Sequence, residues 1–425
     1  MVDDGETERR RVQAPRPSRR KVRRVGIGLG IILGLIAAVG FLYLRSSPAW
    51  GALDLFADDR RAESFRTMHL TFPSREVAAS GDVWTFGREE RSLPRTYGFD
   101  GEDRSLIAFL RDSETTGLLV SVDDVIVHER YGPGYDPHAL VTSFSVAKSF
   151  LSALVGVAVD RGYVGSIDDA ISEYVPELRG SGYEGVAIRD VLTMSSGVAF
   201  DEDYGSARSD VMMLPVQVYL LRRSVPSILA RLERARTPGT LHAYASSDAL
   251  ALGLLVSHAT DRSVAEFLEE TIWLPAGMAS TAAWNTDLHG NELAHAFLGA
   301  TLRDYARFGR LYLHEGERDG RQVVPREWVR ASVAPAAEHL QPGPGTLASA
   351  RFGYGFQWWI PAEPEGDFLA MGIWGQFVYV HPGHRVVIVK TSTDPQFGAR
   401  FAETVAAFRS IARALAGEAS GVTVR

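Results

Sequence analysis

Two residues of this chain have the types and the spacing to do chemistry together, Ser145 and Lys148 in the tetrapeptide S-V-A-K. Residues i and i+3 lie on one face of a helix, so this spacing brings a hydroxyl beside an amine. In the first turn of a helix the serine would also lie among unpaired backbone N–H groups, at the positive end of the dipole. Burial and that dipole both lower the pKa of a lysine, whose usual value is about 10.4. The pair therefore predicts a serine nucleophile activated by a neutral lysine base.

The sparing use of lysine supports a chemical role for Lys148. The sequence contains 42 arginines but only three lysines, Lys21, Lys148 and Lys390. A solvent-facing cation could be an arginine, whereas a general base could not, because a guanidinium does not lose its proton in proteins. The alternative is a helix N-cap at Ser145 with a lysine that reaches solvent. A second S-x-x-K match at 18–21 lies in a basic tail without a core, and we interpret it as accidental.

The elements that position the motif can be read from apolar spacing. A run of apolar residues after Ser145 predicts a buried helix that stops near Gly162, and residues 401–415 predict an amphipathic helix that ends at Gly417. Two β-hairpins are expected, at 117–132 with a turn at Asp123 and Asp124, and around the turn 381–384. Residues 145–335 are mainly helical. The predicted fold class is α/β (α+β), with an antiparallel sheet closed by both ends of the domain and a helical region inserted.

The first 44 residues predict a membrane anchor. Residues 1–24 carry a net charge of +5, residues 25–44 contain no charged or amide side chain, and the whole chain has a charge of −7. Twenty residues at a rise of about 1.5 Å span about 30 Å, the thickness of a bilayer core. Basic residues before the span predict a cytoplasmic N-terminus and an extracytoplasmic remainder. The alternative, a cleaved signal peptide, needs a shorter apolar stretch and a small-x-small site, which is missing after Leu44.

Composition excludes several classes of protein. The absence of cysteine excludes a disulfide framework, a thiolate metal site and a cysteine nucleophile. The acidic net charge argues against a nucleic-acid partner. No histidine forms a metal-ligand spacing with a neighbour, so we expect no metal and no cofactor.

Several segments around the S-x-x-K motif resemble the serine β-lactamase and penicillin-recognising superfamily, most closely its branch of 6-aminohexanoate-dimer hydrolases and related esterases. The resemblance runs from about residue 60 to residue 415 in the family's order. The segments that carry it are SFSVAKSFLSALVGVAVDRGYV, DDAISEYVPEL, IRDVLTMSSGV, YASSDALALG, TLRDYARFGRLYL, YGFQWW and MGIWGQFVYVHP, with PGT at 238–240. It implies a β-lactamase-like antiparallel sheet flanked by helices with an all-helical subdomain, here preceded by one transmembrane helix.

The resemblance assigns roles to individual residues. It makes Ser145 the nucleophile, Lys148 the base and Tyr244 the proton relay to the leaving group. The backbone N–H groups of Ser145 and Ile373 would form the oxyanion hole. Substrate would be bound by Ser246, which stands where many members have Asn, and by the segment that replaces the family's third motif. The substrate residues in that segment are Gly372, Trp374, Gly375 and Gln376.

That segment lacks the cation with which the family's third motif grips a carboxylate. Trp374, together with Trp358 and Trp359, suggests an apolar pocket suited to esters or less polar amides, and the alternative for these tryptophans is ordinary core packing. The sequence Lys390-Thr391-Ser392 resembles the family's third motif, but we do not assign it that role. Asp201, Glu202 and Tyr204 could lie on a loop over the cleft, but we prefer to interpret them as part of a solvated acidic loop.

The predicted domains are a basic cytoplasmic tail (1–24), an anchor (25–44), a linker and wrapping segment (45–100) and a β-lactamase-like hydrolase domain (101–417). The predicted function is a membrane-anchored extracytoplasmic serine hydrolase that cleaves a small-molecule ester or amide. Two alternatives remain. One is a D-Ala-D-Ala peptidase or β-lactamase that acts on cell-wall-like substrates, and the other is a tethered sensor or binding protein that does not turn over.

Overall fold

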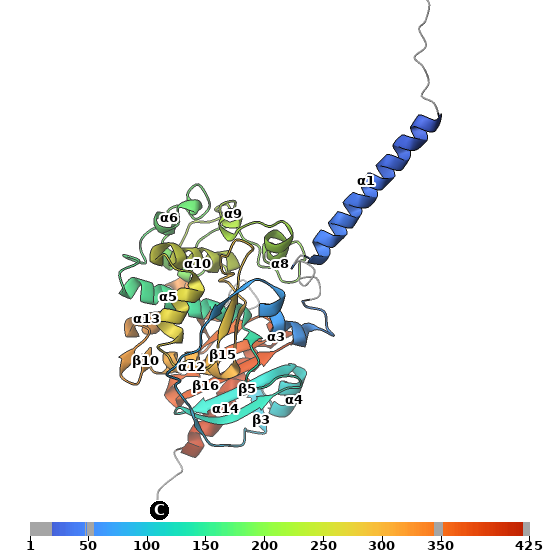
Figure 1. Ribbon diagram of the computed structural model, residues 1–425. Coiled ribbons are helices and arrows are strands. Elements are labelled where there is room, and N and C mark those ends of the chain that lie inside the picture. Colours follow the sequence, from blue (N-terminus) through green and yellow to red (C-terminus); the bar gives the residue numbers. More distant parts are fainter. Residues whose placement is uncertain (1–18, 47, 49–54, 344–351, 420–425) are drawn as a thin grey trace, which may run out of the picture.

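The computed structural model of the chain describes residues 19–46, 48, 55–343 and 352–419, and the side chains of residues 30–43, 48, 55–343 and 352–416 (Figure 1). The helices of more than four residues within this part are α1 (Arg19–Ser46), α3 (Arg61–Thr71), α4 (Leu106–Asp112), α5 (Ala147–Asp160), α7 (Ile188–Leu192), α8 (Asp210–Pro215), α9 (Val225–Leu229), α10 (Ser246–Thr260), α11 (Val264–Leu268), α12 (Leu302–Leu313), α13 (Arg326–Ser332) and α14 (Phe401–Ala419), with the π-helical turns η3 (Val216–Leu220) and η4 (Glu269–Trp273).

The largest sheet has eight strands in the order β12-β13-β14-β15-β16-β5-β6-β2, and every pair is antiparallel except β2 with β6. Its strands are β12 (Gly353–Tyr354), β13 (Trp359–Ile360), β14 (Phe368–Gly372), β15 (Gln376–His381), β16 (Val386–Ser392), β5 (Thr115–Val122), β6 (Val125–Tyr131) and β2 (Gly87–Arg88). Strands β5 and β16, far apart in sequence, are neighbours in register from Val122 opposite Val386. Both predicted hairpins are confirmed, and Asp123 and Asp124 adopt the positive φ angles of a tight turn.

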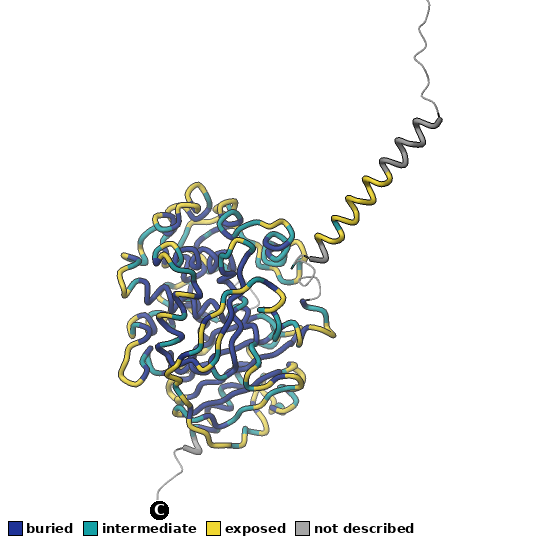
Figure 2. The backbone as a smooth tube through the Cα atoms, in the orientation of Figure 1, coloured by how far each residue is buried: buried dark blue, intermediate teal, exposed yellow. Residues whose placement is uncertain are grey.

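Helices cover both faces of this sheet because successive side chains of a strand point to opposite faces. On β15, Val378 and Val380 face α12, where they lie close to Gly309. Phe377 and Tyr379, which alternate with them, pack against Phe408 of α14. Along the backbone tube in Figure 2, the strands between these two helices are buried. The predicted C-terminal amphipathic helix is confirmed as α14, which extends two residues beyond Gly417.

The middle of the chain forms the helical part, in which α5 packs against α10 (Figure 1). Helices and loops make up most of residues 145–335, as predicted for a helical and loop-rich region, but this region also contributes strands. A four-stranded sheet has the order β1-β8-β9-β7, made of β1 (Ser74–Val77), β8 (Ala282–Asn285), β9 (Leu298–Ala300) and β7 (Val141–Thr142). The remaining strands form two hairpins, β3 (Thr96–Phe99) with β4 (Glu102–Ser105) and β10 (Glu317–Arg318) with β11 (Arg321–Gln322). The α+β fold class follows.

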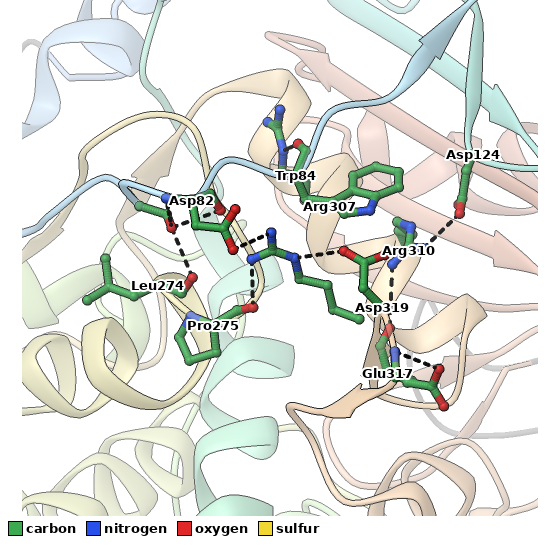
Figure 3. A network of polar contacts seen from close by, with 12 residues as sticks. Asp82, Trp84, Asp124, Leu274, Pro275, Arg307, Arg310, Glu317 and Asp319 are labelled. Carbon is green, nitrogen blue, oxygen red and sulfur yellow. Dashed lines mark hydrogen bonds and ion pairs between the residues drawn. The ribbon is translucent and has the colours of Figure 1, made fainter.

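The segment that precedes the sheet is attached to the body by buried aromatic and polar contacts. Phe65 of α3 is buried, and Arg318 binds the Asp82 carboxylate at 2.9 Å and the Pro275 carbonyl at 3.1 Å (Figure 3). Arg310 lies 3.9 Å above the Trp84 ring and binds Asp124. These contacts join the segment to α12 and to the β10–β11 hairpin. The predicted domain boundaries stay predictions.

Helix α1 extends away from the body and its described apolar side chains are exposed (Figures 1 and 2). Within the described part of the chain, no helix combines the length and the apolar character that crossing a membrane requires. Residues 1–18 of the basic tail, and the side chains of residues 25–29 and 44 of the predicted anchor, lie outside the described part. The anchor therefore stays a prediction.

Candidate active site

The candidate nucleophile lies where a short 3-10 turn, Phe144–Val146, leads into α5. Phe144 has a φ of 44°, so the chain turns sharply before Ser145. The side chain of Ser145 is partly exposed. The end of β14 approaches this turn so closely that a Cβ built on Gly372 would lie 2.3 Å from the Ser143 carbonyl oxygen and 3.2 Å from the Ser145 nitrogen. Only a glycine fits at this approach.

Lys148 is buried and its amine makes three polar contacts. Nζ lies 2.9 Å from Oγ of Ser145, 3.3 Å from Oγ of Ser246 and 2.7 Å from the carbonyl oxygen of His295. Burial lowers the pKa of Lys148 to about 8, although the negative charge of Glu202 opposes the shift. The alternative of a lysine that reaches solvent is therefore wrong.

These three contacts suit both forms of the amine, since an ammonium can donate one N–H to each oxygen and the neutral amine keeps a lone pair for one of the three neighbours. The His295 carbonyl can only accept a hydrogen bond, and Ser246 can accept one because its own hydroxyl donates to Glu202 at 2.7 Å. An amine that donates its two N–H groups to these oxygens has one lone pair left, and the third neighbour is the Ser145 hydroxyl. The arrangement can take the serine proton without any rearrangement of the other partners.

Glu202 is a site residue that the sequence analysis assigned to a solvated loop, and for this residue that interpretation is wrong. Its carboxylate accepts hydrogen bonds from the backbone N–H and the hydroxyl of Ser246, both at 2.7 Å, and from the Tyr204 hydroxyl. Burial raises the pKa of Glu202, and the positive charge of Lys148 opposes the rise. Tyr204 is also partly buried, whereas Asp201 is exposed as expected. Glu202 follows Gly197 by five residues, and no spacing in the sequence distinguishes this carboxylate from the neighbouring Asp201.

Tyr244 lies beside the pair, with Nζ of Lys148 5.0 Å from the centre of its ring. Its ring stacks on Trp359 at 5.3 Å and meets Tyr354 edge-on at 6.2 Å, which fixes its orientation. Burial and the charge of Glu202 raise the pKa of Tyr244, and a hydrogen bond with Ser145 acts in the opposite direction. A phenol with a raised pKa stays protonated and can serve as a proton donor.

The segment that replaces the third motif is the turn between β14 and β15. Three residues, Ile373 to Gly375, connect the paired residues Gly372 and Gln376, and Trp374 and Gly375 adopt positive φ angles of 64° and 82°. The turn brings Ile373 to the rim of the cleft that contains Ser145. Gly372 and Gly375 supply close packing, since a Cβ on Gly375 would lie 3.1 Å from Oγ of Ser392.

The side chains of Gln376 and Trp374, two residues predicted to bind substrate, contact protein groups. The amide of Gln376 is buried, and both its nitrogen and its oxygen form hydrogen bonds with the backbone of Ser392. Nε2 donates to the Ser392 carbonyl at 2.6 Å, and Oε1 accepts from the Ser392 N–H at 3.2 Å. Trp374 stacks on Phe56 at 5.4 Å and lies under the guanidinium of Arg61 at 4.6 Å. Gln376 therefore braces the turn and Trp374 supports the wall behind the cleft.

Lys390, which imitates the third motif, is buried behind the turn. Its Nζ lies 3.3 Å from the position of a Cβ on Gly375, and burial lowers its pKa to about 7. The neighbouring hydroxyls bind protein groups, Thr391 with Thr116 at 3.0 Å and Ser392 with the Ser113 carbonyl. Trp358 is likewise a core residue, packed against Phe308 and Tyr312.

A cleft lies in front of Ser145 and has a cavity volume of about 70 Å³. Its walls come from α3, α8, η3, the loop 293–297 and the turn at Ile373. Ser145, Ser246 and Tyr204 are among its polar lining residues. Among the described residues, no three His, Asp or Glu side chains converge in a way that could hold a metal ion.

Comparison with known proteins places this site in context. The family model described as Beta-lactamase matches residues 103–411. A 6-aminohexanoate-dimer hydrolase from Paenarthrobacter ureafaciens is 30% identical over 295 residues, which cover 67% of this chain and 74% of that protein. Penicillin-binding protein 4* from Bacillus subtilis (strain 168) is 23% identical over 191 residues, covering 43% and 41%.

The fold is shared with a solved structure from Bacillus anthracis whose assignment as a 6-aminohexanoate-dimer hydrolase is provisional. The TM-score is 0.76 at 24% identity, and the match covers 86% of this chain and 96% of the other. At this identity the likeness is evidence of the fold alone.

Proposed function

The chain belongs to the beta-lactamase family and is a serine hydrolase of amides or esters, and from this premise we propose that Ser145, Lys148 and Tyr244 carry out the reaction. The observation that supports these roles is the contact of 2.9 Å between Nζ of Lys148 and Oγ of Ser145. The other two neighbours of the amine are acceptors, so the neutral form directs its lone pair at the serine.

In the first half of the reaction, Lys148 takes the proton of Ser145 while Oγ bonds to the carbonyl carbon of the substrate. The backbone N–H groups of Ser145 and Ile373 stabilise the oxyanion. Glu202 lies behind Ser246 and balances the ammonium that forms on Lys148. Tyr244 donates its phenol proton to the leaving alcohol or amine as the bond to the carbonyl carbon breaks, and Lys148 returns a proton to Tyr244.

In the second half, water attacks the acyl-enzyme carbonyl and gives up a proton to Lys148. The bond between Oγ and the acyl carbon breaks, the carboxylic acid leaves, and Ser145 regains its hydrogen. Every proton is exchanged among the substrate, water and these three side chains.

Covalent labelling of Ser145 tests these roles. A fluorophosphonate probe should label the wild-type chain on Ser145, as mapped by mass spectrometry, and Ser145→Ala should abolish both the label and p-nitrophenyl acetate turnover. Lys148→Arg should lower kcat/KM by about 10³-fold, because a guanidinium cannot accept the proton. A label that persists on another serine, or an arginine variant with normal activity, would contradict the assignment.

Labelling with a fluorescent penicillin and burst kinetics with a p-nitrophenyl ester distinguish the alternative functions. Stable labelling by a fluorescent penicillin would favour the D-Ala-D-Ala peptidase or β-lactamase. The site offers that substrate class little, since no Lys or Arg side chain lines the described cleft to bind a carboxylate. A burst of one p-nitrophenolate per chain without turnover would favour the tethered sensor.

We also propose that residues 25–44 anchor the enzyme in a membrane, with the N-terminus in the cytoplasm and the hydrolase domain outside. The support is the uncharged apolar run behind a basic block, together with the exposed apolar side chains of α1. The full-length chain should stay in the membrane fraction after alkaline carbonate washing, and external protease should digest its domain in intact cells. Release by carbonate would contradict the anchor.

A further inference from the structure

The cleft beside Ser145 is lined by aromatic and aliphatic side chains from distant parts of the sequence. Phe56 precedes α3, Phe72 follows it, Leu214 lies on α8, Val218 lies on η3 and Phe297 precedes β9. Among the described residues that line the cleft, none is Asp, Glu, Lys or Arg. A group that enters the cleft therefore loses water without gaining an ionic partner.

The polar side chains in the cleft walls are already occupied or uncharged. The Tyr219 hydroxyl donates to the Thr286 carbonyl at 3.0 Å, and the Asn285 amide donates to the carbonyls of residues 68, 72 and 73. The Tyr204 hydroxyl donates to Glu202. Burial lowers the pKa of His295 well below its usual value, and the positive charge of Lys148 lowers it further, so this imidazole is neutral.

The place of Tyr244 decides which part of the substrate occupies the cleft. The leaving group must lie next to the phenol that protonates it, and Tyr244 does not line the cleft, whereas Ser145 and Ile373 do. The ring of Tyr244 is stacked on Trp359, on the side of β13. The leaving group therefore departs toward Tyr244, and the acyl part of the substrate extends into the cleft.

We propose that this cleft is an acyl pocket for an uncharged aliphatic or aromatic chain, so that the enzyme takes esters or amides of apolar carboxylic acids and rejects acyl chains with a charged end. The inference rests on the proposed function. It separates this chain from an enzyme for 6-aminohexanoyl substrates, whose acyl chain ends in an ammonium. Glu202, which binds the cleft residues Tyr204 and Ser246, already accepts three hydrogen bonds and does not itself line the cleft.

The test compares two p-nitrophenyl esters of one shape, 7,7-dimethyloctanoate and 6-(trimethylammonio)hexanoate. They share the leaving group and chain length and differ in a permanent positive charge at the chain end. We expect kcat/KM for the neutral ester to exceed that for the cationic ester by about 100-fold, since an apolar pocket cannot solvate the charge. Equal values, or a preference for the cationic ester, would overturn the proposal.

A variant of the pocket wall tests the same proposal by changing the protein, with the same two esters as substrates. Met212 lines the cleft on α8 and is only partly buried. Met212→Glu should lower turnover of the neutral ester and raise that of the cationic ester, and Met212→Gln, of the same shape without the charge, should leave the preference for the neutral ester in place. A Met212→Glu preference unchanged from wild type, in a chain with normal circular dichroism, would overturn the acyl assignment.

The two proposals fail in different ways. Absence of any Ser145 label or acetate turnover would overturn the proposed function and this inference with it. Normal labelling and acetate turnover without discrimination between the paired esters would overturn the acyl pocket alone.

Discussion

At the scale of single residues, the chemistry depends on one buried amine with a balanced set of neighbours. Lys148 has two acceptors and one serine hydroxyl around Nζ, and burial rather than a positive neighbour lowers its pKa. Glu202 acts against that shift, which keeps the pKa near the range in which a base can both take and return a proton. The pH dependence of the reaction should report this balance.

Activity should rise with pH and level off above about 8, the pKa of Lys148, because only the neutral amine accepts the serine proton. Glu202→Gln removes the charge that favours the ammonium, so the rise in kcat/KM should move to lower pH. Asp201→Asn, an exposed neighbour, is the matched control and should leave the profile unchanged. A Glu202→Gln profile that moves to higher pH would contradict the electrostatic role of Glu202.

Lys390, the second buried lysine, should lower the stability of the folded protein. The folded pKa of Lys390 is about 7, below the unfolded value of about 10.5, so between these values the unfolded chain binds more protons and stability rises with pH. Lys390→Met should raise the free energy of unfolding at pH 7 by at least about 2 kcal/mol. It should also flatten the rise in stability from pH 7 to 10. Urea unfolding at pH 7 and pH 9.5 measures both effects, and a less stable Lys390→Met chain would show that the amine has a needed partner.

At the scale of elements, the site is built where the end of β14 meets the turn that enters α5. The register of β14 with β15 places Gly372 opposite Gln376, and the hairpin turn between them brings Ile373 to the cleft. The close approach of β14 to the turn before α5 leaves no room for a side chain on Gly372. The two elements can therefore pack this closely only when that residue is a glycine.

Gly372→Ala should therefore separate the two elements and impair catalysis more than folding. The added methyl group would lie 2.3 Å from the Ser143 carbonyl oxygen, and a shift of about 1 Å at the nucleophile costs about 100-fold in kcat. Gly98→Ala, on β3 with open space around its Cβ, is the control and should keep full activity. Steady-state kinetics with thermal unfolding distinguishes the two outcomes; full activity of Gly372→Ala would show that the approach is not required.

At the scale of the whole molecule, segments distant in sequence are joined around the sheet. Strand β16, near the C-terminus, pairs with β5, and α3 supplies a wall of the cleft from the N-terminal side. Arg318 joins the loop at Asp82 to the loop at Pro275, and Arg310 contacts Trp84 and Asp124 (Figure 3). The N-terminal segment is thus part of the folded unit rather than a free linker.

Arg318→Ala should destabilise the protein without changing its chemistry. It leaves the Pro275 carbonyl and the Asp82 carboxylate without their partner, at a cost of about 1 to 3 kcal/mol in the free energy of unfolding. Arg321→Ala, on the same hairpin but exposed, should have almost no effect. Denaturant unfolding and kcat/KM at 25 °C are the measurements, and a large loss of activity at full stability would contradict a purely structural role.

The sequence by itself determined the local elements and the motif. The spacing of apolar residues and the residue types at the turns determined both hairpins, α14 and the helix after Ser145, because these signals depend on residues that are close in the sequence. The rarity of lysine singled out Lys148, and the order of the motifs indicated the family.

Only the tertiary structure decided which side chains meet. Glu202 reaches Ser246 across 44 positions, and Lys148 reaches the His295 carbonyl across 147. Such contacts leave no periodic signal, since they arise when α5, α10 and the intervening loops pack together. The same packing turned Gln376 toward the backbone of Ser392 and placed Trp374 behind the cleft. A residue type states what a side chain can do, whereas its partners and its exposure to water, which fix its pKa and its access to substrate, exist only in the folded chain.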